Sequence, residues 1–389
     1  MSQPPQNLSA DIRCLIDEGY EVEIRALHLL VHHVPYLDSA RQVKFGILIS
    51  KLSFAGDRVQ WPGTNGDHIA YFTGDFPCFP DGRPMEGLRH QSNPITLVDG
   101  LVAQHSFSNK PPGNYIDYHH KMTRYVEMLS DQARAVDPSA KAITHKLIEL
   151  GDEHSVFVYP DTNSSRAEIT AVSNRLSGLK IAIIGLGGTG AYVLDQAAKT
   201  PVEQIHIFDG DLFAHHNAFR APGAPAMETL HDPPLKVDYF AERYSQMHRG
   251  IKVHRHYVSS ETVTPLAEMD FVFICVDKPL AKRVIFDYLE AAGKPFIDVG
   301  MGLQLVDGQI LGTARATLST PANRNTARQA VSLVDDGDDV YSTNIQVADL
   351  NMLNASLAVI RWKKLYGFYH DRNQEFHSTY TIDSHMLTE

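Results

Sequence analysis

The stretch LKIAIIGLGGTG, residues 179–190, decides the fold of this chain. A short run rich in isoleucine meets Gly185, Gly187, Gly188 and Gly190, and a segment of helical composition, AYVLDQAAK, follows. This order predicts a buried parallel strand, a tight turn and a helix N terminus, where free backbone N–H groups and the helix dipole bind phosphate. The GxGxxG spacing therefore predicts a nucleotide site, and it occurs both in dinucleotide-binding dehydrogenases and in enzymes that use ATP.

The composition is typical of a globular protein that acts away from nucleic acid and membranes. The chain has 389 residues, 43% of them hydrophobic, and a net charge of −11, which argues against non-specific binding to nucleic acid or to an anionic membrane. No apolar run reaches the roughly 18 residues that a membrane-spanning helix needs. Because the N terminus also lacks a secretory signal pattern, we expect a cytoplasmic protein.

Residues 1–160 are predicted to form a separate α+β domain. Aromatic-rich runs with a period of two residues, which is typical of strands, are separated by turn-forming clusters such as PGTNGD and NKPPGN. These runs cover residues 25–34, 42–54, 68–76 and 100–108. One face of a helix over 116–136 would carry Tyr118, Met122, Tyr125, Val126 and Leu129.

Residues 161–389 are predicted to form a doubly wound α/β domain with a mostly parallel, Rossmann-like sheet. Apolar strand-like runs alternate with helical runs, which is the pattern of such a sheet. We expect strands at 180–184, 205–209, 251–258, 270–275 and 295–299, and helices at 188–199, 235–248 and 279–292. A hairpin that turns at Asp307-Gly308, a polar loop at 322–339 and an amphipathic helix at 346–366 follow them.

Polar residues follow the second and fourth predicted strands of this domain. Asp209 ends the second strand, at the position where dinucleotide-binding folds hold a ribose hydroxyl. The further polar residues are Asp211, Asn217 and Arg220 on the loop, Lys236 at the start of the next helix, and Asp277 after the fourth strand. Because the carboxyl ends of parallel strands meet at one edge of the sheet, we expect these side chains to surround one ligand.

These motifs together resemble the adenylating enzymes of the ThiF and MoeB type, which activate ubiquitin and ubiquitin-like sulfur carriers. The resemblance extends from about Arg166 to residue 365 and rests on GLGGTG, on DGD at 209–211, and on Asn217, Arg220, Lys236 and Asp277. It implies that Asp209 binds the ATP ribose, that Asn217, Arg220 and Lys236 hold the triphosphate, and that Asp277 organises Mg²⁺. Arg166 resembles, with a looser spacing, the arginine that each subunit of such dimers lends to its partner's phosphates.

The residue types suit the chemistry of adenylation. A carboxylate attacks the α-phosphate and pyrophosphate leaves, so negative charge develops on several groups at once and cations are required. Arg220 can bind phosphate oxygens bidentately, Lys236 supplies a point charge, and Mg²⁺ at Asp277 prefers carboxylate ligands. No general base is needed, because a carboxylate is already ionised at neutral pH.

The resemblance implies an ATP- and Mg²⁺-dependent adenylyltransferase that activates the C-terminal carboxylate of a ubiquitin-like protein in a bacterial conjugation pathway. Its expected partners are that protein's C-terminal tail, a second copy of the chain in a homodimer, and a conjugating enzyme. One alternative is an NAD-dependent oxidoreductase, which leaves Asn217, Arg220, Lys236 and Asp277 without a joint purpose. The other is a ThiF-like binding protein that has lost the reaction.

The cysteines leave open whether a thioester forms. Thioester-forming members of the family carry a nucleophilic cysteine and often a zinc-binding CxxC pair beyond the nucleotide site, and neither follows Cys275. Cys275 itself lies in an apolar run, which predicts a buried, unreactive thiol. Cys78, within FPCFPDGRP of the N-terminal domain, is the remaining internal recipient. That domain is therefore expected to serve either in recognition or as a conjugating-enzyme-like module.

Overall fold

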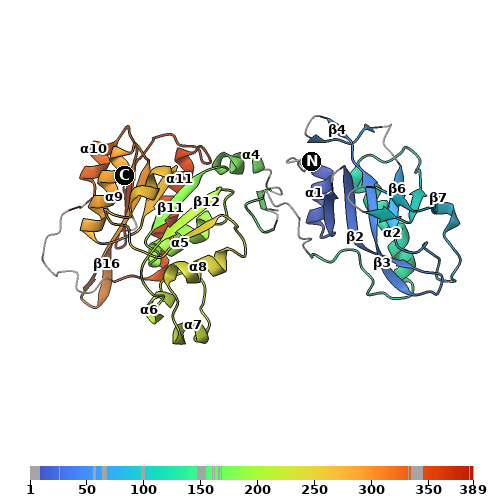
Figure 1. The fold of residues 1–389 in the computed structure, drawn as a ribbon, viewed down its shortest axis with the longest axis horizontal. Helices are drawn as coiled ribbons and strands as arrows, with labels where there is room; N and C mark the ends of the chain where they lie inside the picture. Colours follow the sequence, from blue (N-terminus) through green and yellow to red (C-terminus); the bar gives the residue numbers. More distant parts are fainter. Residues whose placement is uncertain are drawn as a thin grey trace. The chain divides into compact units, whose positions relative to one another are not determined.

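The computed structural model divides the chain into two compact units (Figure 1). Residues 1–153 and 159–167 make up the N-terminal unit, and residues 154–158 and 168–389 make up the C-terminal unit. The structure describes residues 9–25, 27–55, 58–63, 68–97, 101–146, 155–159, 161, 163–164, 167, 169–331, 333, 345–384 and 386–388. Within these ranges, no helix combines the length and the apolar character needed to span a bilayer.

The N-terminal unit is an antiparallel sheet packed against one long helix. The strand order is β1-β2-β3-β6-β10-β7, and the helix α2 packs on β2 and β3. Asp117 caps α2 by accepting a hydrogen bond from the backbone N–H of His120 at 2.7 Å, as expected for a helix N-cap. The apolar face predicted for this helix is buried in the core of the unit, where Tyr118, Tyr125 and Leu129 pack against the sheet.

The N-terminal elements have the following bounds. The helices are α1 (Ala10–Asp17), the short 3-10 helix η2 (Glu86–Leu88) and α2 (Tyr118–Arg134). The strands are β1 (Val22–Arg25), β2 (His28–Leu37), β3 (Val43–Lys51), β4 (Phe54–Ala55), β5 (Arg58–Val59), β6 (Ile69–Thr73), β7 (Arg89–Gln91), β8 (Ile95–Thr96), β9 (Val102–Ala103) and β10 (His105–Ser108).

The C-terminal unit is built on an eight-stranded sheet in the order β13-β12-β11-β14-β15-β16-β17-β18. Neighbouring strands are parallel from β13 to β15 and antiparallel from β15 to β18. The strands are β11 (Lys180–Ile184), β12 (Gln204–Phe208), β13 (Ile251–His254), β14 (Phe271–Ile274), β15 (Phe296–Val306), β16 (Gln309–Ser319), β17 (His377–Thr381) and β18 (Met386–Thr388). The predicted α/β fold class, with a separate α+β unit before it, is confirmed.

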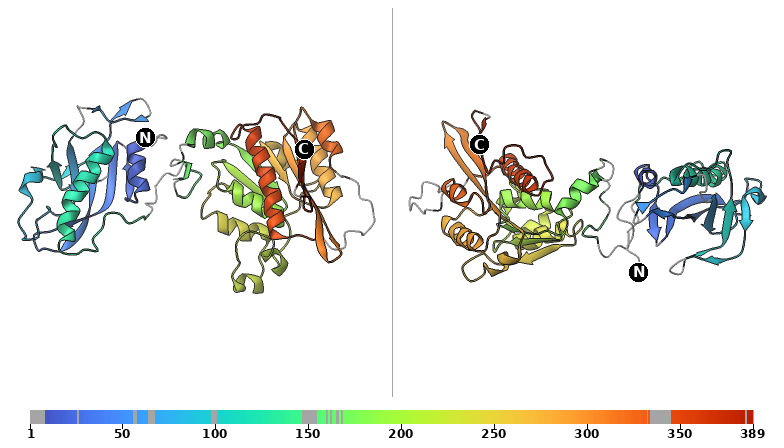
Figure 2. Two further views of the ribbon diagram at one scale, coloured as in Figure 1. Left: turned by 180° about the vertical axis from the view of Figure 1, so that it is seen from behind. Right: turned by 90° about the horizontal axis from the view of Figure 1, so that it is seen from above.

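Helices cover both faces of this sheet (Figure 2). α5 (Gly188–Ala197), α8 (Lys236–Tyr244) and α11 (Ala348–Leu365) share one apolar core with the inward residues of one face, while α9 (Pro279–Ala291) and η4 (Thr264–Glu268) cover the other. The alternation along β11 explains this, since Ile181 and Ile183 point to the first core and Ala182 and Ile184 to the second. The shorter helices are α4 (Thr170–Ser173), η3 (Asn174–Leu176), α6 (His215–Ala218), α7 (Met227–His231) and α10 (Arg324–Gln329).

Two predicted segments differ from the structure. The range 322–339 was expected to be a polar loop, but its described part contains the helix α10, because Arg328 forms ion pairs with Asp287 and Glu290 of α9 at 2.6 Å. The strand expected over 251–258 ends at His254, because its partner β12 ends at Phe208. The hairpin turn at Asp307-Gly308 is as predicted, with φ of +50° and +76° at the two residues.

Candidate functional site

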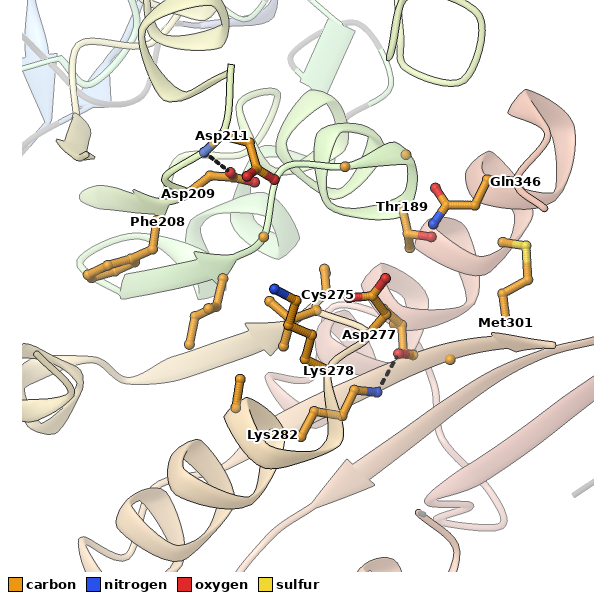
Figure 3. Close-up of a pocket in the computed structure, with 18 of the residues that line it drawn as sticks. Thr189, Phe208, Asp209, Asp211, Cys275, Asp277, Lys278, Lys282, Met301 and Gln346 are labelled. Carbon is orange, nitrogen blue, oxygen red and sulfur yellow. Dashed lines mark hydrogen bonds between the residues drawn. The ribbon is translucent and has the colours of Figure 1, made fainter. Parts of the chain in front are cut away.

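A cavity of about 490 Å³ lies at the carboxyl ends of the central parallel strands (Figure 3). The chain reverses its direction across the sheet here, because β12 and β13 lie on one side of β11 and β14 and β15 on the other. Open α/β sheets bind ligands at such a switch point, and a cavity of this size accommodates a ligand as large as a nucleotide. Residues that follow β11, β12 and β14 line it together.

The glycine turn forms the floor of the cavity beside the N terminus of α5. Gly185 has a φ of +88°, which favours glycine, and Gly185, Gly187 and Gly188 line the cavity. Gly190 lies beneath the turn, where a Cβ atom would be 1.8 Å from the carbonyl oxygen of Gly185. The glycines therefore permit a close turn whose backbone N–H groups can face a phosphate.

Asp209 connects the glycine turn to the end of β12. Its Oδ2 accepts a hydrogen bond from the backbone N–H of Leu186 at 2.7 Å, and its Oδ1 accepts one from the N–H of Asp211 at 2.8 Å. The side chain is buried but lines the cavity. One carboxylate thus fixes both the glycine turn and the loop that follows β12. Figure 3 shows Asp209 and Asp211 at this end of the cavity, beside Phe208.

Lys236 is buried at the start of α8 and is neutralised by two carboxylates. Its Nζ lies 2.7 Å from Oδ2 of Asp211 and 3.7 Å from Oδ2 of Asp209, and the hydroxyl of Tyr257 donates to the other oxygen of Asp211. Burial alone would raise the pKa of Asp211, but the hydrogen bonds from Lys236 and Tyr257 hold that pKa below its ordinary value. The ammonium group is therefore held at the cavity wall by charge.

Arg220 reaches the cavity from the loop that follows α6, and Asn217 supports this loop from below. Burial lowers the pKa of the Arg220 guanidinium, while Asp277 and Asp211 favour its charged form. No residue in the described part of the chain accepts a hydrogen bond from its Nε. Asn217 is buried outside the cavity lining, and its Oδ1 accepts a hydrogen bond from the backbone N–H of Ala214 at 2.9 Å.

The opposite wall carries a carboxylate and a buried ion triad. Asp277 follows β14 and lines the cavity (Figure 3). Below it, the fully buried Asp298 lies 2.6 Å from Nζ of Lys282 and 2.7 Å from Nη2 of Arg315, so two cations share one carboxylate. Cys275 also lines the cavity, and burial raises the pKa of its thiol. This wall is therefore positively charged at depth and acidic at Asp277.

Uncharged side chains, most of them polar, form the far end of the cavity. Thr189, Met301 and Gln346 lie across the cavity from Asp209 and Asp211 in Figure 3. Asn351 and Asn354 of α11 line the same cavity, and Asn351 accepts a hydrogen bond from the hydroxyl of Thr189 at 2.9 Å. One end of the cavity is thus charged and the other carries amides and a hydroxyl.

Comparison with known families assigns the two parts of the chain. Residues 10–162 match a domain of unknown function, DUF6791, and residues 165–347 match the ThiF family. Residues 165–347 form a ThiF family domain. This ThiF domain contains the glycine turn, β11 to β16 and most of the cavity lining.

Individual relatives are distant. The adenylyltransferase and sulfurtransferase UBA4 of Eremothecium gossypii is 26% identical over 148 residues, which are 36% of this chain and 29% of that protein, so the chain spans less than a third of its relative's length. Among solved structures, MccB of E. coli with MccA-N7isoASN has 15% identity and a TM-score of 0.47, covering 59% of this chain and 72% of that one. PaaA has 15% identity and a TM-score of 0.45, with coverage of 59% and 83%.

The structure brings together most of the residues that the sequence singled out in the ThiF domain. Those that line the cavity are Gly185, Gly187, Gly188, Asp209, Asp211, Arg220, Lys236 and Asp277. Gly190 and Asn217 lie outside the lining, and Arg166 lies outside the described residues. Sequence reasoning missed Tyr257, Lys282, Asn351 and Asn354. The two asparagines, three residues apart on one face of the helix α11, were the one available signal.

Proposed function

We propose that the ThiF domain is an adenylyltransferase that uses ATP to activate a carboxylate. The observation that carries the proposal is the convergence of Arg220, Lys236 and Asp277 on one cavity above the glycine turn. The family match over residues 165–347 and the local similarity to a named adenylyltransferase support it. An oxidoreductase would need neither the two cations nor the carboxylate that faces them.

ATP would bind with its ribose at the Asp209 end of the cavity and its phosphates above the glycine turn. Asp209 would accept a hydrogen bond from a ribose hydroxyl, with Asp211 beside it, and the glycine turn would bind phosphate oxygens through its N–H groups. Arg220 and Lys236 would bind the triphosphate, the first bidentately and the second as a point charge. Asn217 would act through the loop that positions Arg220, because its side chain lies below the cavity surface.

The reaction transfers AMP to the acyl group. A carboxylate oxygen forms a bond to the α-phosphorus, and the bond between that phosphorus and the oxygen bridging to the β-phosphate breaks. The electron pair leaves with pyrophosphate, so no proton has to move. Arg220 and Lys236 would stabilise the charge that accumulates on the phosphates, and fixed positions in the cavity would supply much of the rate.

Mg²⁺ fits the donor set of the cavity with Asp277 as its protein ligand. Magnesium is usually held by one or two carboxylates together with substrate phosphates and waters, so a cluster of protein ligands is not required. The described residues contain no group of three or more histidine, cysteine or acidic side chains arranged for a metal. When bound, the ion would neutralise phosphate charge.

We extend the proposal to the C-terminal carboxylate of a ubiquitin-like protein, in a bacterial conjugation pathway in which this chain is the activating enzyme. A homodimer is the proposed assembly, with Arg166 reaching the partner's phosphates, and sedimentation analysis of the full chain tests it.

For the N-terminal unit we favour recognition, because Cys78 is 2% exposed and burial raises the pKa of its thiol. A thioester on this cysteine would require the surrounding loop to open.

ATP–pyrophosphate exchange tests the proposed activity. The full chain is incubated with ATP, Mg²⁺, labelled pyrophosphate and a panel of ubiquitin-like proteins and their C-terminal tail peptides. Label should enter ATP only when an acceptable carboxylate is present. Asp277→Asn is the matched inactive control, because it keeps the size of the side chain and removes its charge.

Two results would contradict this function. If NADH binds in the cavity and ATP does not, the oxidoreductase becomes the better interpretation. If ATP binds but no carboxylate in the panel supports exchange, the domain is better described as a ThiF-like binding protein without the reaction.

A further inference from the structure

The helix α11 presents two asparagines to the cavity at a depth where packed helices carry apolar residues. Asn351 and Asn354 are 1% and 0% exposed, and their spacing of three residues places them on one side of the helix. A buried amide is favourable only when its hydrogen bonds are made. The partners of each amide therefore indicate what it does.

Asn351 is satisfied within the protein. Its Oδ1 accepts a hydrogen bond from Thr189 at 2.9 Å, and its Nδ2 donates to the carbonyl oxygen of Arg220 at 3.4 Å. It also packs directly on Gly188, where a Cβ atom would lie 2.0 Å from its Nδ2. Asn351 thus supports the glycine turn and the Arg220 loop, and it needs no ligand.

Asn354 is only half satisfied. Its Nδ2 donates to the carbonyl oxygen of Gly300 at 3.0 Å, and no donor in the described part of the chain reaches its Oδ1. The orientation of this amide is set by chemistry, because a carbonyl can only accept and so the nitrogen must face Gly300. The side chain lines the cavity, so a buried acceptor there lacks its donor.

The missing donor cannot come from the groups that react. Phosphate and carboxylate oxygens at neutral pH are acceptors, so neither the triphosphate nor the attacking carboxylate can bind this oxygen. The ribose hydroxyls belong to the Asp209 end of the cavity in the proposed function, and so does the amino group of the adenine that the ribose carries. Asn354 lies at the other end, one helical turn from Asn351 and bonded to Gly300 beside Met301. The acyl substrate would lie there, and its remaining donor is the N–H next to the reacting carboxyl group.

We propose that Asn354 is a specificity-determining residue whose Oδ1 accepts the amide N–H of the residue that is adenylated. This inference rests on the proposed function and narrows its substrate class. It selects carboxylates that follow a peptide N–H, which are the C termini of peptides and proteins. It disfavours hydroxy acids, and also terminal residues whose nitrogen is alkylated, such as proline.

Two acyl-adenylate mimics that differ at one atom test the inference without knowledge of the natural substrate. N-acetylglycyl-sulfamoyladenosine carries the N–H, and its acetylglycoloyl counterpart replaces that group by an ester oxygen. Adenosine 5′-sulfamate, without an acyl group, reports the nucleotide site alone. Calorimetry on the full chain should give at least about tenfold tighter binding of the amide mimic, because the ester places an acceptor against the Asn354 oxygen.

Variants of Asn354 assign the discrimination to this side chain. Asn354→Leu keeps the branching of the side chain at Cγ and has no acceptor, and Asn354→Ala is a second variant in case the larger leucine packs badly. In either, the ratio of the two affinities should fall below about threefold, while adenosine 5′-sulfamate binds as in the unaltered chain. Ser356→Ala on the same helix, outside the cavity lining, is the control and should keep the full ratio.

Three outcomes would overturn the inference, and they can be told apart. Equal affinity of the unaltered chain for the two mimics means that the protein does not recognise the amide N–H of the substrate. If both Asn354 variants still bind the amide mimic more tightly than the ester mimic, another group recognises the N–H. If neither ATP nor adenosine 5′-sulfamate binds at all, the proposed function fails and this inference fails with it.

Discussion

Two cations, Lys121 of the N-terminal unit and Arg220 of the ThiF domain, differ in how far the protein itself satisfies their hydrogen bonds. In the N-terminal unit, Lys121 is 0% exposed, and its Nζ donates to Oγ of Ser50 at 2.9 Å and to the carbonyl oxygen of Ile69 at 2.7 Å. In the ThiF domain, Arg220 is half-buried, and its Nε lacks a partner in the described part of the chain. The first cation serves the fold, whereas the second has hydrogen-bonding capacity left for a ligand.

A cation whose donors are not all used by the protein is therefore the better candidate for function. Changes at Arg220 and at the nearby Asp277 should reduce activity and leave stability nearly intact, and changes at Lys121 should do the reverse. Four experiments test this difference, and the effect expected is largest for Asp277→Asn.

The largest effect is expected for Asp277→Asn. Removing the one carboxylate proposed to hold Mg²⁺ should lower the rate of ATP–pyrophosphate exchange about 1,000-fold or more, equivalent to about 4 kcal/mol. Thermal unfolding should be unchanged, because Asp277 lies at the cavity surface. Asp232→Asn, outside the cavity, is the control, and a loss below tenfold for Asp277→Asn would remove Asp277 from the mechanism.

Arg220→Ala should cost about 2 to 4 kcal/mol of transition-state stabilisation, measured as kcat/KM for adenylation. Its free energy of unfolding should change little, because the guanidinium has few partners to lose. Arg255→Ala is the matched control, since Arg255 pairs with Asp238 at 2.8 Å away from the cavity. A fall in kcat/KM of less than tenfold would contradict the role proposed for Arg220. A loss of unfolding free energy as large as the loss of transition-state stabilisation would mean that Arg220, like Lys121, serves the fold.

Lys121→Met should destabilise the N-terminal unit by about 1 to 3 kcal/mol, because the Ser50 hydroxyl and the Ile69 carbonyl each lose the hydrogen bond that they accept from Lys121. Urea unfolding followed by the fluorescence of Trp61, in a Trp362→Phe background, reports this unit, since Trp61 packs on Tyr118 with ring centroids 4.8 Å apart. The exchange rate should stay the same. Lys141→Met, at an exposed lysine, is the control. If Lys121→Met lowered the rate of ATP–pyrophosphate exchange and left the stability unchanged, Lys121 would serve activity and not the fold.

The smallest effect concerns the cysteines. Cys14 is exposed, whereas Cys78 is buried and its thiol pKa is raised by burial. At neutral pH, Cys14 should react with a thiol-specific disulfide reagent at least about tenfold faster than Cys78 or Cys275. Mass mapping of the labelled peptides measures the three rates. Equal reactivity of Cys78 and Cys14 would favour a thioester role for the N-terminal unit.

The sequence predicted the ThiF domain well, because its signals are local. The glycine turn, the alternation of strands and helices, and the hairpin at Asp307-Gly308 each depend on neighbouring residues, and all three are present. Local patterns also explain why Asp209 and Asp277 could be placed at one edge of the sheet. Each follows a parallel strand, and such strands end together.

The parts that could not be predicted depend on contacts between distant residues. Tyr257 follows a strand with no motif of its own, and contacts such as that of its hydroxyl with Asp211 place it in the site. The short helix α10 is held by ion pairs between Arg328 and α9, which no local pattern contains. The role proposed for Asn354 depends on α11 packing beside Gly300 of β15.

Because Asp209 holds two backbone segments at once, loss of activity in its mutants cannot be assigned to one contact. Since its carboxylate accepts the backbone N–H groups of both Leu186 and Asp211, Asp209→Ala would release two loops as well as the proposed sugar contact. Weaker ATP binding in that variant would therefore include the entropy of ordering a freed backbone. A 2′-deoxy or 3′-deoxy nucleotide, tested on the unaltered chain, isolates the sugar contact instead.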